Sequence, residues 1–150
     1  ALAQPACGMD FGTSNSTFAV AEGNQRARLL PLEGQSVTLP SVIFFSFETD
    51  EVFFGRAAMA DYVSGGDGRL MRSLKSVLGS SLFSDATRVK RRSMSFAEIL
   101  GTFIGELRRR AEVEPGGAFL RNRHGVVAGR TVCVVDVEAD RRLVAGQQGQ

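Results

Sequence analysis

Cysteine, histidine and long apolar runs are all scarce in this chain of 150 residues, and each scarcity excludes a class of function. Cys7 and Cys133 fall within predicted strands and lack metal-ligand spacing, so we expect buried, reduced thiols rather than a disulfide or a metal site. The single histidine, His124, has no carboxylate or cysteine motif beside it and is predicted to be structural or exposed. No apolar run approaches the roughly 20 residues that span a bilayer, which excludes a transmembrane role.

Composition and charge are ordinary for a globular protein of the cytoplasm. With 43% hydrophobic and 23% charged residues, the chain is expected to form one domain with a substantial core. The net charge of +2 rests mostly on arginine, with clusters at Arg88–Arg92, Arg108–Arg110 and Arg121–Arg123. These clusters lack interleaved aromatic residues, and acidic residues nearly balance them, so we predict solvated faces and neither a nucleic-acid nor a membrane partner.

The most informative segment is Gly8–Ser16, whose sequence is GMDFGTSNS. Its small turn residues leave backbone N–H groups available to an anion, while the carboxylate of Asp10 can face the cation that accompanies phosphates. Thr17–Ala21 is rich in β-prone residues, and Glu22–Asn24 follows as a turn. A P-loop would instead end in GK[ST] and open a helix. The segment is therefore predicted to be a phosphate-binding turn that joins two strands.

This hairpin, with DxGT at its turn, resembles the first phosphate loop of the actin-like ATPases. The longer string GMDFGTSNSTFAV is similar to the opening of the ATPase domain in the heat-shock protein 70 family, and in particular in its bacterial DnaK-like relatives. Three later segments resemble that family in the same order: Thr38–Phe45 its "TPS" strand, Phe54–Ala58 its "GxxA" step, and Arg72–Gly79 its "KRLIG" segment. The resemblance covers roughly the first 136 positions.

The resemblance implies an α/β protein with the actin-like ATPase (ribonuclease H-like) fold. Residues 1–150 would be an N-terminal fragment of the nucleotide-binding domain, holding part of its first lobe with a mixed β-sheet and packed helices. Residues 38–94 would form an excursion into a peripheral subdomain. In the intact parent, the partners would be unfolded client peptides and co-chaperones, and the cofactors ATP or ADP with Mg²⁺.

The same resemblance assigns roles to six positions. Asp10 would hold the metal and assist hydrolysis, and Lys75 would orient the attacking water near the terminal phosphate. Lys75 is one of only two lysines in the chain, and a compact ammonium can approach the phosphate closely. The backbone and hydroxyl groups that contact the phosphates would come from Gly12, Thr13, Ser14 and Asn15.

Other functions remain open at this stage. A sugar or acetate kinase would share DxGT but transfer phosphate to a small molecule, and an actin-type scaffold would use nucleotide to control assembly. A third possibility is a fragment without activity that self-associates through exposed apolar patches. One lobe supplies only half of the nucleotide-binding cleft, so it neither excludes water nor fixes the adenine. We therefore expect the isolated chain to bind ATP very weakly and to hydrolyse it at a negligible rate.

Local patterns predict most of the elements. Strands are expected at Cys7–Phe11, Ser16–Ala21, Arg26–Leu32, Val37–Phe47, Glu51–Phe54 and Gly125–Val135. A short helix is expected near Arg56–Tyr62, helix-prone chain at Leu70–Val77, and a surface loop or hairpin at Ser81–Met94.

The clearest predicted helix begins at Ser95, which forms an S-x-x-E capping box with Glu98. Apolar residues then recur at three- and four-residue steps: Phe96, Ile99, Leu100, Phe103, Ile104, Leu107 and Ala111. Pro115–Gly117 ends the helix. A stripe of this width is predicted to pack in the core rather than to bind a partner.

Overall fold

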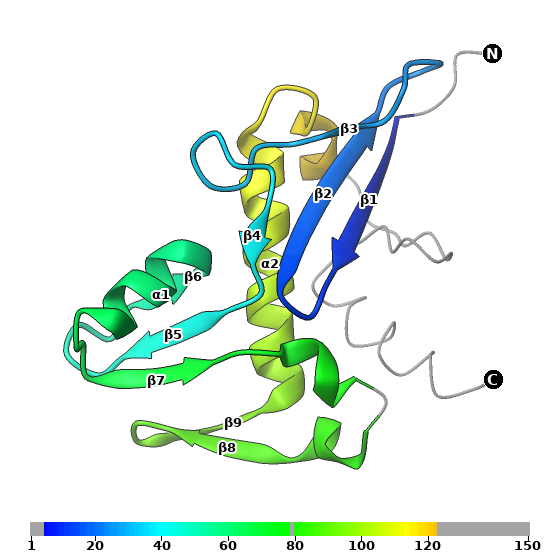
Figure 1. The fold of residues 1–150 in the computed structure, drawn as a ribbon. Coiled ribbons are helices and arrows are strands. Elements are labelled where there is room, and N and C mark those ends of the chain that lie inside the picture. Colours follow the sequence, from blue (N-terminus) through cyan, green and yellow to red (C-terminus); the bar gives the residue numbers. More distant parts are fainter. Residues whose placement is uncertain (1–4, 79, 123–150) are drawn as a thin grey trace.

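The computed structural model describes residues 5–78 and 80–122. Two small sheets and a separate hairpin surround a long central helix, α2 (Phe96–Val113), as Figure 1 shows. The predicted strand at 125–135, together with His124 and Cys133, lies outside the described residues.

The first sheet is built on the hairpin of β1 (Ala6–Phe11) and β2 (Asn15–Ala21). The register pairs Asp10 with Thr17 and Phe11 with Ser16, and alternate side chains of each strand enter the core. Both predicted strands are confirmed. Their burial alternates with the period of two that is typical of a strand with one buried face.

Two short strands, β3 (Arg28–Leu29) and β4 (Leu39–Pro40), both pair with β2. The strand predicted at Arg26–Leu32 is thus shorter than expected. Its end is set by a turn, because the backbone N–H of Leu32 donates to the carbonyl oxygen of Ser36 at 2.8 Å. All strand pairings among the described residues are antiparallel, so these residues do not contain a parallel part of the predicted mixed sheet.

The second sheet has β5 (Ile43–Ser46) between β6 (Val52–Phe54) and β7 (Gly68–Met71), and α1 (Gly55–Val63) packs against it. The short predicted helix is confirmed as α1. The helix-prone prediction for Leu70–Val77 is wrong in its first part, because Leu70 and Met71 pair with Phe44 and Ile43 of β5. The fully buried strand β5 has backbone hydrogen-bonding groups along the edge that faces β7. Pairing with this edge outweighs the local helix propensity of Leu70 and Met71. Only η1 (Leu74–Val77) is helical, as a 3₁₀ turn.

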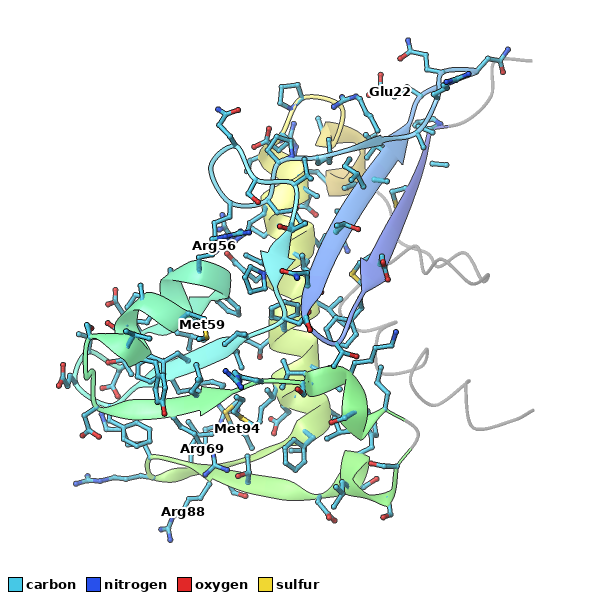
Figure 2. The ribbon with its side chains drawn as sticks, in the orientation of Figure 1. Glu22, Arg56, Met59, Arg69, Arg88 and Met94 are labelled. Atoms are coloured by element: carbon cyan, nitrogen blue, oxygen red, sulfur yellow. The ribbon has the colours of Figure 1, made fainter. Side chains whose placement is uncertain are left out.

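Residues 81–95 form a 3₁₀ turn, η2 (Ser81–Ser84), and an antiparallel hairpin of β8 (Ala86–Val89) and β9 (Arg92–Ser95). Of the two structures predicted for this stretch, the hairpin is therefore correct. The guanidinium of Arg69 on β7 donates to the carbonyl oxygen of Arg88 on β8 at 3.2 Å (Figure 2), which ties the hairpin to the second sheet.

Helix α2 begins where the capping box predicts. Ser95 Oγ accepts from the N–H of Glu98 at 3.1 Å, and Glu98 Oε2 accepts from the N–H of Ser95 at 2.8 Å. The hydrogen bond from the Ser95 backbone is the main reason that the pKa of Glu98 lies below its ordinary value, and Arg92 lowers it further. The prediction of a core stripe is confirmed, because the buried side chains of α2 are Ile99, Leu100, Phe103, Ile104, Leu107 and Ala111.

Replacing Ser95 with alanine is expected to lower the free energy of unfolding by about 1 kcal/mol, because the N–H of Glu98 loses its acceptor. Urea unfolding followed by circular dichroism measures this loss. Ser93→Ala, on the exposed side of the same strand, is the matched control and should change stability by less than about 0.5 kcal/mol. Equal losses in the two variants would show that the cap contributes nothing.

The triple arginine of α2 is less solvated than predicted. The side chain of Arg109 is 62% exposed, but those of Arg108 and Arg110 are only 13% and 20% exposed. Acidic residues three or four positions away draw these side chains along the helix surface, as in the pair of Arg110 with Glu106 at 2.8 Å. Burial raises the pKa of Glu106, but hydrogen bonds from Arg109 and Arg110 more than offset it and keep that pKa below its ordinary value.

Glu33 connects three parts of the chain. Its carboxylate accepts from the backbone N–H and the guanidinium of Arg56, at 2.9 and 2.8 Å, near the start of α1. It also lies 3.8 Å from the guanidinium of Arg110 on α2. Arg56 in turn donates to the carbonyl oxygen of Thr38 at 2.8 Å, just before β4 (Figure 2). The segment that leads into β4 is thus held at its start by ion pairs.

Candidate functional site

The predicted phosphate-binding turn lies at the tip of the β1–β2 hairpin. The N–H of Gly12 donates to the carbonyl oxygen of Asn15 at 3.0 Å, and Thr13, Ser14 and Asn15 are exposed. Glycine is required at position 12 because a Cβ there would lie 2.2 Å from the carbonyl oxygen of Asn15. The structure thus brings Gly12, Thr13, Ser14 and Asn15 together in one tight, accessible turn.

Ser41, immediately after β4, braces this turn from the protein side. Its Oγ donates to the carbonyl oxygen of Gly12 at 2.7 Å, and its N–H donates to the carbonyl oxygen of Ser14 at 2.9 Å. Its Oγ also lies 2.8 Å from the Oγ of Ser16, and both serine side chains are fully buried. Two buried hydroxyls under an exposed turn form a rigid support, because buried polar groups keep their hydrogen bonds.

Sequence reasoning missed both serines. The available signal was the position of Ser41 within the apolar segment Val37–Phe47, where a polar side chain needs a buried partner. The identity of that partner, Ser16, depends on the pairing of β2 with β4 and could not be read from the sequence alone.

Asp10 lies on β1, two residues before Gly12, with its side chain exposed. Because cross-strand pairs share a face, Asp10 and Thr17 project from the face opposite to Phe11 and Ser16. Phe11 contacts Phe103 of α2, so Asp10 is on the face turned away from that helix. No other described residue forms an ion pair or hydrogen bond with its carboxylate, so within this part of the chain its oxygens are available.

A complete metal-binding cage is not present in the described part of the chain, where no three His, Cys, Asp or Glu side chains gather. Asp10 is thus a single carboxylate beside a turn of backbone groups. This donor set suits Mg²⁺, which usually keeps several waters and takes one or two carboxylates together with phosphate oxygens.

Lys75 lies in η1 and is exposed. The residue before this turn, Ser73, has a left-handed backbone with φ of 54°, which redirects the chain as it leaves β7. In the view of Figure 1 the turn lies below the tip of the β1–β2 hairpin. Within residues 5–78 and 80–122, nothing forms an ion pair or hydrogen bond with its ammonium group.

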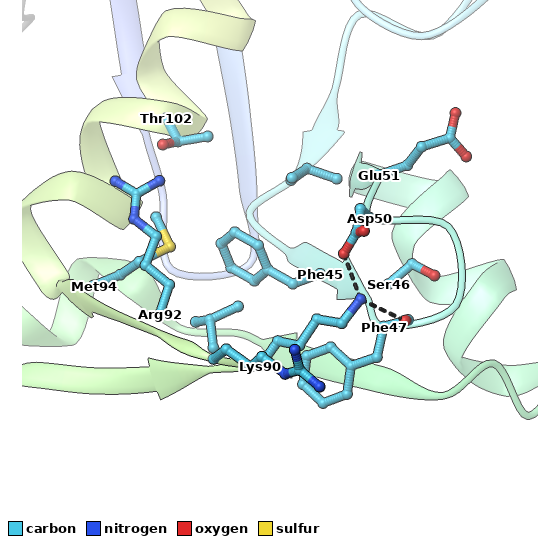
Figure 3. A pocket seen from close by; sticks show the side chains of 12 residues that line it. Phe45, Ser46, Phe47, Asp50, Glu51, Lys90, Arg92, Met94 and Thr102 are labelled. Carbon is cyan, nitrogen blue, oxygen red and sulfur yellow. Dashed lines mark hydrogen bonds and ion pairs between the residues drawn. The ribbon is translucent and has the colours of Figure 1, made fainter.

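A separate cavity of about 820 Å³ opens between the β5–β6 turn and the β8–β9 hairpin (Figure 3). Phe45, Val89 and Met94 line its apolar part. At its rim the ammonium of Lys90 donates to Asp50 Oδ1 at 2.5 Å and to the carbonyl oxygen of Phe47 at 2.8 Å. The remaining charges on the rim have both signs, so the lining favours neither anions nor cations. None of the phosphate-, metal- or water-binding residues predicted from the sequence lines this cavity.

The chain is similar to a known protein family. The family model described as "Hsp70 protein" matches residues 6–100, which include the hairpin, Ser41, η1 and the start of α2. No helix among the described residues combines the length and apolar character needed to cross a membrane.

Proposed function

Because the chain belongs to the Hsp70 protein family, we propose that the tip of its β1–β2 hairpin binds the phosphates of Mg²⁺·ATP in a chaperone-type ATPase domain. The observation that carries the proposal is the tight Gly12–Asn15 turn, hydrogen-bonded to Ser41, beside the carboxylate of Asp10, which has no ion-pair or hydrogen-bond partner in residues 5–78 and 80–122. The family match favours the chaperone over the sugar-kinase and actin-type alternatives, although all three would share the DxGT turn.

The roles within this site follow from the chemistry of each group. Asp10 would hold the magnesium ion, which when bound neutralises charge on the phosphate oxygens. Thr13, Ser14 and Asn15 would supply N–H and hydroxyl donors to the phosphates, and Gly12, whose own N–H is bonded to Asn15, would shape the turn that presents them. Lys75 would place a compact positive charge near the terminal phosphate and orient a water molecule. Since phosphoryl transfer depends on positioning and charge neutralisation, no protein nucleophile is needed.

We extend the proposal to the division of the chain into subdomains. The described residues would form the first lobe of the ATPase domain, with 38–94 as its peripheral part. The second sheet and the β8–β9 hairpin support this division because most of their strands fall within that range. Hydrolysis by a closed, two-lobed site, binding of client peptides and co-chaperones, and a cytoplasmic location belong to this proposal and rest on the family alone.

The proposal is tested by titrating the chain with ATP, with and without magnesium, and following backbone amide shifts by NMR. A single lobe should bind with a Kd in the millimolar range, worth about −4 kcal/mol. Asp10→Asn should abolish the effect of magnesium and weaken binding about fivefold. Lys75→Ala should weaken binding about two- to threefold but leave the effect of magnesium intact.

Asp67→Asn is the matched control, because this exposed carboxylate lies in the turn before β7, away from the hairpin tip, and should leave binding unchanged. Absence of any shift at residues 12–15 at saturating ATP would contradict the proposal. Micromolar affinity would instead contradict the view that a second lobe is required.

A further inference from the structure

We propose that Ser41, supported by Ser16, is a positioning residue that turns backbone N–H groups of the Gly12–Asn15 turn outward toward a phosphate anion. The inference rests on the proposed function of the same turn and adds the device that orients its donors. Three hydrogen bonds meet at the buried Ser41.

The direction of the hydroxyl bonds is fixed. Ser41 Oγ carries one hydrogen, and the carbonyl oxygen of Gly12 at 2.7 Å can only accept it. In the 2.8 Å hydrogen bond between the two hydroxyls, Ser16 Oγ must therefore be the donor and Ser41 Oγ the acceptor. The resulting chain runs from Ser16 through Ser41 to Gly12, and each bond polarises the next. Since both serine side chains are fully buried, water cannot replace either of them without opening the structure.

Bonds to the two carbonyl oxygens determine where two N–H groups point. A trans peptide holds its C=O and N–H on opposite sides, and the described residues contain no cis peptide. The carbonyl of Gly12 is directed to Ser41 Oγ, so the N–H of Thr13 points away from Ser41. The carbonyl of Ser14 is directed to the N–H of Ser41, so the N–H of Asn15 also points away.

This orientation matches the position of Asp10. The side chain of Ser16 shares a face of the hairpin with Phe11, whereas Asp10 is on the opposite face. Ser41 Oγ is bonded to Ser16, so the N–H of Thr13 is directed away from that face and toward the side of Asp10. An anion and its cation could therefore meet the amide and the carboxylate on the same side of the turn.

Mutation can separate the two hydrogen bonds that Ser41 donates to the turn, one from its hydroxyl and one from its backbone N–H. Ser41→Ala removes the hydroxyl bond to Gly12 but retains the backbone N–H that bonds Ser14. We expect magnesium tripolyphosphate to shift the amide signals of both Thr13 and Asn15 in the wild-type chain. In Ser41→Ala the shift at Thr13 should be lost, the shift at Asn15 should persist, and the affinity should fall about fivefold. Ser16→Ala should give the same pattern with a smaller loss, about twofold.

Ser46→Ala is the matched control, because Ser46 is also buried and accepts a hydrogen bond, from the N–H of Thr49 at 3.3 Å. It should leave both amide shifts unchanged. A merely structural role for Ser41 would weaken Thr13 and Asn15 together, and that result would overturn the inference. Normal shifts at both amides in Ser41→Ala would also overturn it while leaving the proposed function intact. No shift in the wild-type chain would refute the proposed function itself.

Hydrogen exchange in the free wild-type chain provides a measurement that does not depend on the variants folding. The amides of Thr13 and Asn15 should exchange rapidly, while that of Gly12, which is bonded to Asn15, should be protected. Protection of Thr13 comparable to that of Gly12 would show that its N–H points inward and would overturn the inference.

Discussion

Phe103→Ala is expected to lower the free energy of unfolding by about 3–5 kcal/mol, the range for removing a large aromatic side chain from a core. Phe103 is fully buried on α2 and its ring lies 5.7 Å from that of Phe11 and 6.4 Å from that of Phe54, measured between centroids. Removing it would delete the ring contacts that α2 makes with β1 of the first sheet and β6 of the second. Thermal unfolding by calorimetry should show a fall in Tm of roughly 6–20 °C.

Leu82→Ala provides the control for this loss. Leu82 lies in η2 with about half of its side chain exposed, so its truncation should change stability by less than about 0.5 kcal/mol. A loss below about 1 kcal/mol for Phe103→Ala would contradict the packing described for α2.

Gly12→Ala is expected to weaken phosphate binding more than tenfold and to destabilise the fold by about 1–3 kcal/mol. The added Cβ would lie 2.2 Å from the carbonyl oxygen of Asn15. The clash is with backbone, so it can be relieved only by opening the turn. Opening breaks the bond from Gly12 N–H to Asn15 and displaces the carbonyl that Ser41 holds. NMR titration with magnesium tripolyphosphate measures binding, and urea unfolding measures stability.

Gly101→Ala is a control of opposite sign. Gly101 lies inside α2 with no heavy atom within 4 Å of an added Cβ, so alanine should stabilise the helix by about 0.5–1 kcal/mol. Binding should not change. If Gly12→Ala bound phosphate as well as Gly101→Ala does, the turn would not be the phosphate site.

Features that depend on neighbouring residues could be predicted from the sequence. The alternation in β1 and β2, the capping box at Ser95 and the apolar stripe of α2 are all local patterns, and the structure has each of them where expected. The exposed, tight turn at Gly12–Asn15 also follows from its composition.

Features that depend on distant residues could not be predicted from the sequence. The segment at Leu70–Met71 becomes a strand only because β5, about 25 residues earlier, offers it an edge. The partner of Ser41 is 25 residues away in the sequence, and only the pairing of β2 with β4 brings them together. Likewise, the cavity lined by Phe45 lies between residues of two distant hairpins, which Lys90 and Asp50 join by an ion pair.

The position of α2 in the sequence also has a consequence for the timing of folding. The core face of the β1–β2 hairpin, with Met9, Phe18 and Val20, packs in the same cluster as α2, which ends roughly 90 residues after the end of β2. At ribosomal speeds of about 5–20 residues per second, synthesis of that interval takes roughly 5–18 seconds. During this time the apolar face of the newborn hairpin has no helix to cover it, so the nascent chain would itself be a fitting client for a chaperone.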